Sequence, residues 1–340
     1  MTSPGDPVLS TGGEMGQRVR EYPWQDSAIG DPSTWPQSVR VATSLCLHSR
    51  FPIVLFLGPT YTLIYNDAYI PMLGTKHPQR ALGQPGAACW AEIWPIVGPM
   101  LDGVFQTGEA TWSENLLLLI ERNTSAEEAY FTFSYSPIFD ERGKVVGVFT
   151  AVTEVTEMIL GERRMKTLRA LAAHTAGAHT LEEVCTIAAQ TLGDNPADVP
   201  FALLYVLSSD GKRARLAARA GLLSSTAASP AELQVADESA AWPLARVLKG
   251  EHMVWLDALE THFGGFAQLF APSEVSVSQQ ALLLPINSVG EEQPYGFLVV
   301  GINPLRPLDD NYQGFLLLLS GQIATASRND RQITCTFYAT

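Results

Sequence analysis

Two apolar runs, FPIVLFL at Phe51–Leu57 and YTLIY at Tyr61–Tyr65, decide the fold of the first half of the chain. Gly58-Pro59 separates them, and this dipeptide is a strong turn signal. Short runs of aliphatic, β-branched and aromatic residues on either side of such a turn predict a β-hairpin. The segment that follows, Asn66–Leu73, predicts a short helix that ends at Gly74.

Three further strand-like runs lie downstream of the hairpin, at Thr111–Ile120, Ala129–Pro137 and Val145–Thr153. In the second run, Phe and Tyr alternate with Thr and Ser, which is typical of a strand with one buried face. A turn at Asp140–Gly143 joins the last two runs. These five strands with short helices between them predict a compact α+β unit that ends near Thr153.

The segments on either side of this unit differ in pattern. The first thirty residues are rich in Pro, Gly and Ser and predict a flexible arm, whereas apolar residues at helical spacing predict a helix over 35–49. After the unit, Glu154–Ala173 is continuous and charged, with Met158, Met165 and Ala172 spaced by seven residues. That spacing indicates a weak coiled-coil seam, and an ordinary amphipathic linker helix remains the alternative.

A second α+β unit follows. Helical spacing predicts a helix at Thr180–Leu192 and a closing helix at Asn311–Ala326. Two strand pairs lie between them, and residues 221–240 predict a long loop. The expected organisation is an N-terminal arm at 1–34, a first domain at 35–153, a linker helix at 154–176, a second domain at 177–326 and an unmatched tail at 327–340.

Composition limits the classes of partner. The 340 residues include 22 Lys and Arg against 35 Asp and Glu, a formal net charge of −13. This charge repels phosphate backbones and anionic lipids, so we expect no nucleic-acid partner. No apolar stretch approaches the ~20 residues of a spanning helix, so we expect no membrane insertion. Four widely spaced cysteines fit a reducing, cytoplasmic setting.

The search for catalytic chemistry is negative. The chain has no phosphate-binding loop of the Gly-x-x-x-x-Gly-Lys-Ser/Thr type, no Gly-x-Ser-x-Gly and no His-Glu-x-x-His. The six histidines are scattered, so neither a metal site nor a catalytic base is predicted. His77 could ligate a haem iron, but a single His in a turn before Pro is more often structural. We therefore predict that this chain is not an enzyme.

The aromatic residues are the main candidates for a binding site. In each domain they are expected to converge on the sheet, either as a filled core or as the lining of a cavity for a small planar ligand. The candidate pocket residues are Tyr65, Asn66, Tyr69, Trp90, Trp94, Phe131, Phe133 and Phe149 in the first domain, and Tyr205, Trp242, Trp255 and Phe297 in the second.

The first domain resembles the PAS family. The resemblance rests on Phe51–Leu55, on the segment Leu63–Tyr69 with its Asn-Asp-Ala step, and on Gly143–Phe149 as the last strand. Glu154 and Thr156 stand where PAS domains commonly carry an Asp-x-Thr junction into a signalling helix. The resemblance therefore implies that both residues relay a signal. A carboxylate near the first turn of the next helix suits the helix dipole, so Glu154 can replace Asp.

The second domain is similar to a GAF domain, on the evidence of Tyr295–Val300, Pro307–Asp310 and the segment from Phe315 to Ala324. The order of the two resemblances is similar to the sensory N-terminal region of hybrid histidine kinases. It implies two α+β domains, PAS-like then GAF-like, each with a central antiparallel sheet and flanking helices and joined by a signalling helix. It also implies a homodimer in a two-component phosphorelay, with a histidine-kinase output domain as partner.

The same families indicate which cofactors to expect. Cys89 does not lie in the Asn-Cys-Arg motif of flavin-binding PAS domains, and the motifs of bilin-binding and cyclic-nucleotide-binding GAF domains are absent. Photoactive flavin, bilin and cyclic nucleotide are therefore disfavoured, haem is not expected, and the ligand is unknown. The alternative function is a protein-interaction or dimerisation scaffold with filled cores and no ligand.

Overall fold

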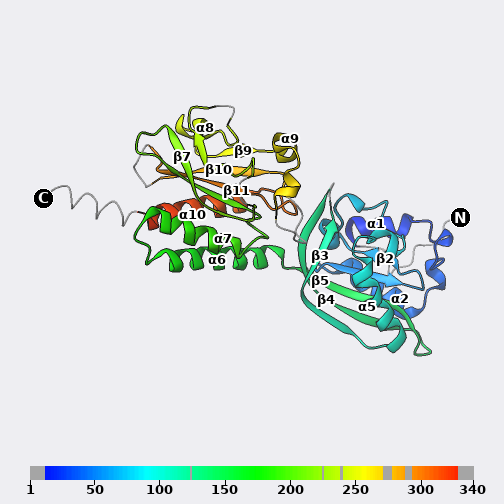
Figure 1. The fold of residues 1–340 in the computed structure, drawn as a ribbon. Helices are drawn as coiled ribbons and strands as arrows, with labels where there is room; N and C mark the ends of the chain where they lie inside the picture. Colours follow the sequence, from blue (N-terminus) through cyan, green and yellow to red (C-terminus); the bar gives the residue numbers. More distant parts are fainter. Residues whose placement is uncertain are drawn as a thin grey trace. The chain divides into compact units, whose positions relative to one another are not determined.

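The computed structural model describes residues 12–122, 125–223, 226–237, 240–270, 278–287 and 293–327. The chain divides into two units, and the boundary lies after Ile159. Figure 1 shows the two sheets and the helices that flank each of them. Both units are α+β with a central antiparallel sheet, as the sequence predicts.

The sheet of the first unit has the strand order β2-β1-β5-β4-β3. Its strands are β1 (Ile53–Leu57), β2 (Thr62–Tyr65), β3 (Thr111–Glu121), β4 (Ala126–Phe139) and β5 (Val145–Glu154). The expected hairpin forms, with Leu57 paired to Thr62 around a turn in which Gly58 has φ +66°. Phe131, Phe133 and Tyr135 on β4 are buried, whereas the Thr and Ser residues between them are only partly buried, which confirms the predicted alternation.

Helices and single turns cover this sheet. They are α1 (Gly13–Glu21), η2 (Trp24–Asp26), η3 (Pro32–Thr34), α2 (Gln37–His48), η4 (Asp67–Tyr69), α3 (Ile70–Leu73), η5 (Gly74–Lys76), α4 (Gly86–Cys89) and α5 (Trp94–Thr107). Helix α2 begins at Gln37 rather than at residue 35, because Trp35 precedes a proline and is extended there. Both α2 and α5 pack on the sheet.

The expectation of a flexible arm at 1–34 is wrong for residues 12–34, and residues 1–11 lie outside the described part of the chain. Helix α1 buries Met15 and Val19, and Trp24 is 2% exposed. The carboxylate of Asp67 accepts hydrogen bonds from the backbone N–H of Glu14 and Met15, at 3.1 and 2.7 Å. This cap comes from a residue 53 positions away in sequence, so local composition could not reveal it.

The sheet of the second unit has the order β8-β7-β6-β11-β10-β9. Its strands are β6 (Ala202–Leu207), β7 (Arg213–Ala220), β8 (Glu232–Gln234), β9 (Val254–Leu256), β10 (Ala281–Ile286) and β11 (Gly296–Gly301). The expected long loop at 221–240 thus contains the short strand β8, which pairs with β7. The helices and the single turn are α6 (Thr156–Thr175), α7 (Leu181–Gly193), α8 (Leu244–Leu248), α9 (Leu259–Phe263), η6 (Phe266–Leu269) and α10 (Asp310–Ala326).

The central strands of this sheet are buried on both faces. Along β6, Leu204 packs into one apolar cluster with α7 and α10, while Leu203 and Tyr205 pack into another with Trp242. Strands β10 and β11 alternate in the same way, which explains why their sequences are continuously apolar. Of the expected tail, Ser327 is described and buried at the end of α10, and residues 328–340 lie outside the described part.

Candidate functional site

The first unit encloses a small cavity between its sheet and the helices that cover one face. The cavity volume is about 40 Å³. The lining side chains are almost all apolar: Val54, Phe56, Tyr69, Met72, Trp90, Ile93, Val97, Leu118, Ile120, Phe131, Phe133, Tyr135, Thr150 and Val152. Space of this size holds one or a few water-sized groups, whereas sites for drug-sized ligands have about 300–1,000 Å³.

Four of the eight residues proposed for this pocket line the cavity: Tyr69, Trp90, Phe131 and Phe133. The other four have different positions. Phe149 lies between Val148 and Thr150 on β5, whose side chains are buried on the opposite face of the strand. The Trp94 ring packs against Tyr61 at an interplanar angle of 57°, with ring centroids 5.6 Å apart. The sequence could not separate these residues, because a helix or a sheet can bury an aromatic ring without bringing it to a cavity.

Asn66 and Tyr65, the remaining two candidates, have partners within the protein. The Asn66 side chain accepts hydrogen bonds from the N–H of Ile53 and Tyr69, and its amide donates to the carbonyls of Ser49 and Phe51. Asn66 therefore connects the start of β1 to the short helices that begin after β2. The Tyr65 hydroxyl lies 2.8 Å from Nδ1 of His77.

Thr150 is the polar residue in the cavity wall that the sequence reasoning missed. It is 1% exposed, and among the described residues its hydroxyl has no hydrogen-bond partner. An unsatisfied buried hydroxyl is costly, so its presence in an apolar cavity is informative. The sequence signal was available in the period-two pattern of β5, which places Val148, Thr150 and Val152 on one face.

Three of the four aromatic candidates of the second unit lie together in one buried apolar cluster. Tyr205, Trp242 and Phe297 are each 0% exposed. The Tyr205 hydroxyl donates to the Pro230 carbonyl at 3.0 Å, and Trp242 Nε1 donates to the Ala228 carbonyl at 2.8 Å. Trp255 does not fit the prediction, because it is 49% exposed on the edge strand β9.

The proposed relay residues Glu154 and Thr156 meet at the junction between β5 and α6. Thr156 Oγ1 donates to Glu154 Oε1 at 2.9 Å and accepts from the N–H of Tyr130 at 3.0 Å. Arg122 Nη2, at the end of β3, donates to Glu154 Oε2 at 2.9 Å. The sequence reasoning missed Arg122. We call Arg122, Tyr130, Glu154 and Thr156 the junction.

Gly74 allows the backbone of Gly74-Thr75 to approach the carbonyl of Arg122 closely. The carbonyl of Arg122 accepts from the N–H of Thr75 at 2.9 Å. Gly74 has φ +53°, and a Cβ at this position would lie 2.1 Å from that carbonyl oxygen. A residue with a side chain would therefore be strained and would clash with the backbone, which explains the glycine.

An internal charge lies beside the cavity. Lys76 is 1% exposed, and its ammonium group forms an ion pair with Glu92. The backbone N–H of Glu121, next to Arg122, donates to the same Glu92 oxygen at 3.0 Å. Burial raises the pKa of the nearby Cys89 thiol to about 12, which keeps it protonated and unreactive at neutral pH.

Both ring nitrogens of His77 have polar neighbours in the first unit. The two ring nitrogens of His77 face the Tyr65 hydroxyl and, at 3.2 Å, Glu14 Oε1. Within the described ranges, no group of three or more His, Cys, Asp and Glu side chains could hold a metal ion. Likewise, no described helix is both long and apolar enough to cross a membrane.

The chain is similar to one family model and to several solved structures. Residues 48–159 match the family model described as the PAS fold. None of the curated proteins matches the chain. A GAF domain from an Acinetobacter phosphoenolpyruvate-protein phosphotransferase is 20% identical to this chain. The match covers 50% of this chain and 95% of that domain, with a TM-score of 0.37.

Two further solved structures are similar. The GAF domain of the corresponding protein from Coxiella burnetii is 19% identical to this chain. The match covers 51% of this chain and 98% of that domain, with a TM-score of 0.38. The bacteriophytochrome RpBphP3 from R. palustris is 12% identical to this chain. The match covers 85% of this chain and 59% of the bacteriophytochrome chain, with a TM-score of 0.38. Residues 48–159 of this two-unit α+β chain match the PAS fold, and solved GAF domains are among the structures to which the chain is similar.

Proposed function

We propose that this chain is a PAS–GAF sensory module that reports the state of its first unit through helix α6. The observation that carries the proposal is the junction. Arg122 directly follows β3 and Tyr130 lies on β4, two of the strands that line the cavity, and both residues contact the segment that starts α6. A change in the position of β3 or β4 would therefore alter the hydrogen bonds that hold the beginning of α6.

The cavity wall suggests the class of ligand. Its lining is apolar except for the hydroxyls of Tyr69, Tyr135 and Thr150, and the Thr150 hydroxyl has no partner among the described residues. A small apolar molecule with one hydrogen-bonding group would satisfy this hydroxyl and fill the space. A larger planar ligand would require the side chains around the cavity to move, because the volume is about 40 Å³.

Dimerisation through α6 and α10 is part of the proposal. Met158 and Met165, the seam positions spaced by seven, are 52% and 47% exposed. On α10, Leu317 and Leu318 are 45% and 58% exposed. Apolar residues on one exposed helix face favour association with a second helix of the same kind. The output partner that we propose is a histidine-kinase domain of a two-component phosphorelay, and the chain itself would have no catalytic role.

We also place the protein in the cytoplasm. Cys46, Cys89 and Cys185 are free thiols and buried, which fits a reducing compartment.

A scaffold without a ligand is the second candidate, and the small cavity and the packed aromatic core of the second unit favour it. Native mass spectrometry of protein purified from its natural host separates the two functions. A bound molecule that is lost in a Thr150→Phe variant supports the sensor, because the larger side chain fills the cavity. An empty protein that still forms dimers supports the scaffold.

Hydrogen exchange of α6 provides the test of the relay itself. Thr156→Val removes the donor to Glu154 and the acceptor for Tyr130 while it keeps the shape of the side chain. Faster exchange in the first two turns of α6, with the sheet unchanged, is expected. Unchanged exchange at the start of α6 would contradict the proposal.

A further inference from the structure

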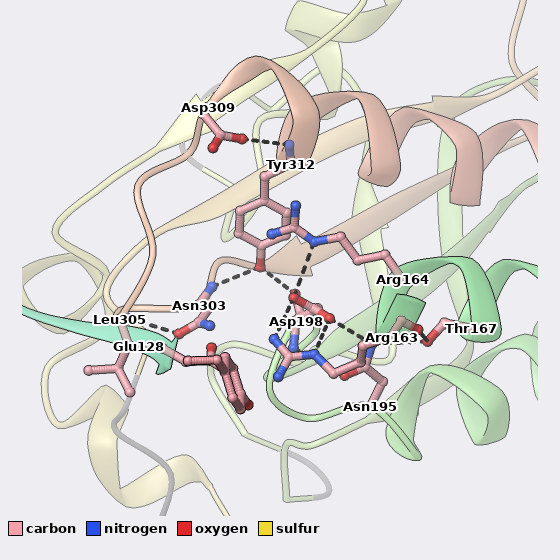
Figure 2. A network of polar contacts seen from close by, with 11 residues as sticks. Glu128, Arg163, Arg164, Thr167, Asn195, Asp198, Asn303, Leu305, Asp309 and Tyr312 are labelled. Carbon is pink, nitrogen blue, oxygen red and sulfur yellow. Dashed lines mark hydrogen bonds and ion pairs between the residues drawn. The ribbon is translucent and has the colours of Figure 1, made fainter. Parts of the chain in front are cut away.

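The second unit contains a buried polar network centred on Asp198, in the loop between α7 and β6 (Figure 2). Asp198 is 0% exposed, and its carboxylate accepts four hydrogen bonds. Arg163 donates two of them, at 2.7 and 2.9 Å, and Arg164 donates a third at 3.3 Å. Asn195 Nδ2 donates the fourth at 3.0 Å. The carboxylate is thus fully satisfied, and both arginines come from α6.

The same aspartate also holds the beginning of α10. The Tyr312 hydroxyl donates to the backbone carbonyl of Asp198 and accepts from the N–H of Asn303 at 2.9 Å. Tyr312 is 0% exposed and lies in the first turn of α10, whose N-terminus is capped by Asp309. In Figure 2, the Arg164 guanidinium and the Tyr312 ring lie on one side of Asp198, and Arg163 lies on the other.

Arg164 contacts both Asp198 and the aromatic rings at the start of α10. Its guanidinium lies 4.3 Å from the centroid of the Tyr312 ring and 5.8 Å from that of Phe315, one turn further along α10. The side chain is 9% exposed, so this cation–π contact is largely shielded from water. A single side chain of α6 therefore touches the carboxylate that anchors α6 and the aromatic rings that begin α10.

We infer that Arg164 and Asp198 are positioning residues that couple the movement of α6 to α10. A rotation or a shift of α6 that breaks the Asp198 pairs leaves a buried charge without a partner, which is strongly unfavourable. The network therefore moves together with α6. Because Tyr312 is bonded to the backbone of Asp198 and stacked under Arg164, the first turns of α10 follow. The apolar contacts of Leu168 and Leu171 with the core lack this directionality.

The inference rests on the proposed role of α6 as the relay helix, but the coupling between α6 and α10 can be measured without a ligand. The experiment is hydrogen exchange of the full chain, read separately in residues 168–175 of α6 and residues 315–323 of α10. The variants are Arg164→Met, Tyr312→Phe and the double variant. Tyr312→Phe keeps the ring under Arg164 and removes only the hydroxyl, so it is expected to fold.

Each single variant is expected to accelerate exchange about fivefold or more in the helix that was not mutated. In the double variant, the fold-acceleration of exchange is expected to be smaller than the product of the two single-variant accelerations, because both substitutions break the same network. Arg169→Met, an exposed position on α6, is the matched control and should leave α10 unchanged. The inference would be overturned if exchange accelerated only in the mutated helix, or if the acceleration in the double variant equalled the product of the two single-variant accelerations.

A third measurement separates this inference from the proposed function. Thr156→Val perturbs the start of α6 without touching the network. If α10 does not respond to Thr156→Val but the reciprocal effects of Arg164→Met and Tyr312→Phe remain, the relay from the first unit fails and the coupling stands. If Arg164→Met is too unstable to measure, Asp198→Asn replaces it. The amide keeps the shape of the carboxylate, and faster exchange is expected in both α6 and α10, because Asp198 contacts both helices.

Discussion

The ammonium group of Lys76 lies 4.2 Å from the centroid of the Trp90 ring, at a position that is 1% exposed. Its charge is balanced by Glu92, whose side chain is 16% exposed. Glu92 also accepts the N–H of Glu121 at the end of β3. The pair therefore connects one wall of the cavity to the end of β3, next to Arg122.

This pair predicts an asymmetry between two substitutions. Glu92→Gln leaves the buried Lys76 charge without a counter-ion and is expected to lower the free energy of unfolding by about 3–5 kcal/mol. Lys76→Met is expected to cost less, roughly 1–3 kcal/mol, because the remaining Glu92 charge can still reach water and the Glu121 N–H. Urea denaturation measures both. The exposed Lys144→Met is the control and should change the value by less than about 0.5 kcal/mol. Equal effects of the two substitutions would contradict this account.

Asn66 is expected to be essential for the stability of the first unit. Asn66→Ala removes two accepted and two donated hydrogen bonds at a fully buried position. Three backbone groups lose their partner, while the Tyr69 N–H keeps the carbonyl of residue 66 at 3.0 Å, so we expect a loss of about 2–4 kcal/mol in the free energy of unfolding. Thermal denaturation followed by circular dichroism is the measurement. Asn311→Ala, at an exposed position, is the control, and a comparable loss in both variants would refute the assignment.

The Thr150 hydroxyl predicts a stabilising substitution. Thr150→Val replaces an unpartnered buried hydroxyl with a methyl group of the same shape, so the ligand-free protein should gain about 1 kcal/mol. Thr132→Val is the matched comparison on the neighbouring strand. It should be destabilising, because Thr132 Oγ1 accepts the N–H of Asn115 at 3.1 Å. If Thr150→Val destabilises the ligand-free protein as much as Thr132→Val does, the hydroxyl has a partner and the ligand class proposed from it is wrong.

Two buried thiols predict a pH dependence at alkaline pH. Burial raises the pKa of Cys89 and Cys185 from 9.0 to about 12. A raised pKa in the folded state gives stability that is complete below pH 9 and is lost as the pH rises toward 12, because the unfolded thiols ionise first. Each thiol contributes a slope of about 1.4 kcal/mol per pH unit in that window.

The double variant Cys89→Ala/Cys185→Ala isolates this effect from other groups that titrate at high pH. We expect the difference in unfolding free energy between the natural protein and the variant to shrink between pH 9 and pH 11. Denaturation at a series of pH values provides the measurement. A difference that stays constant over this range would show that the thiols ionise equally in both states.

Local pattern was sufficient for much of the fold. The alternation of Phe131, Phe133 and Tyr135 with polar residues correctly predicted a strand with one buried face, and Gly58-Pro59 correctly predicted the hairpin. Both features depend on backbone geometry within a few residues. The continuous apolar strands of the second unit were also recognisable. The order of the strands in each sheet was not predicted, because the pattern within one strand does not identify its neighbours.

The sites were less predictable, because they depend on contacts between distant residues. Arg122 reaches Glu154 across 32 positions, and α1 is capped by Asp67 from 53 positions away, so neither partner has a local signature. Phe149 and Trp255 are aromatic like the cavity residues, but the face of a strand and its place at the sheet edge put them elsewhere. Residue patterns alone were enough to place most strands and helices and to identify residues apolar enough to be buried. Which buried groups meet depends on the folded chain, because a satisfied buried charge requires donors from several elements at one point, as at Arg163, Arg164, Asp198 and Tyr312.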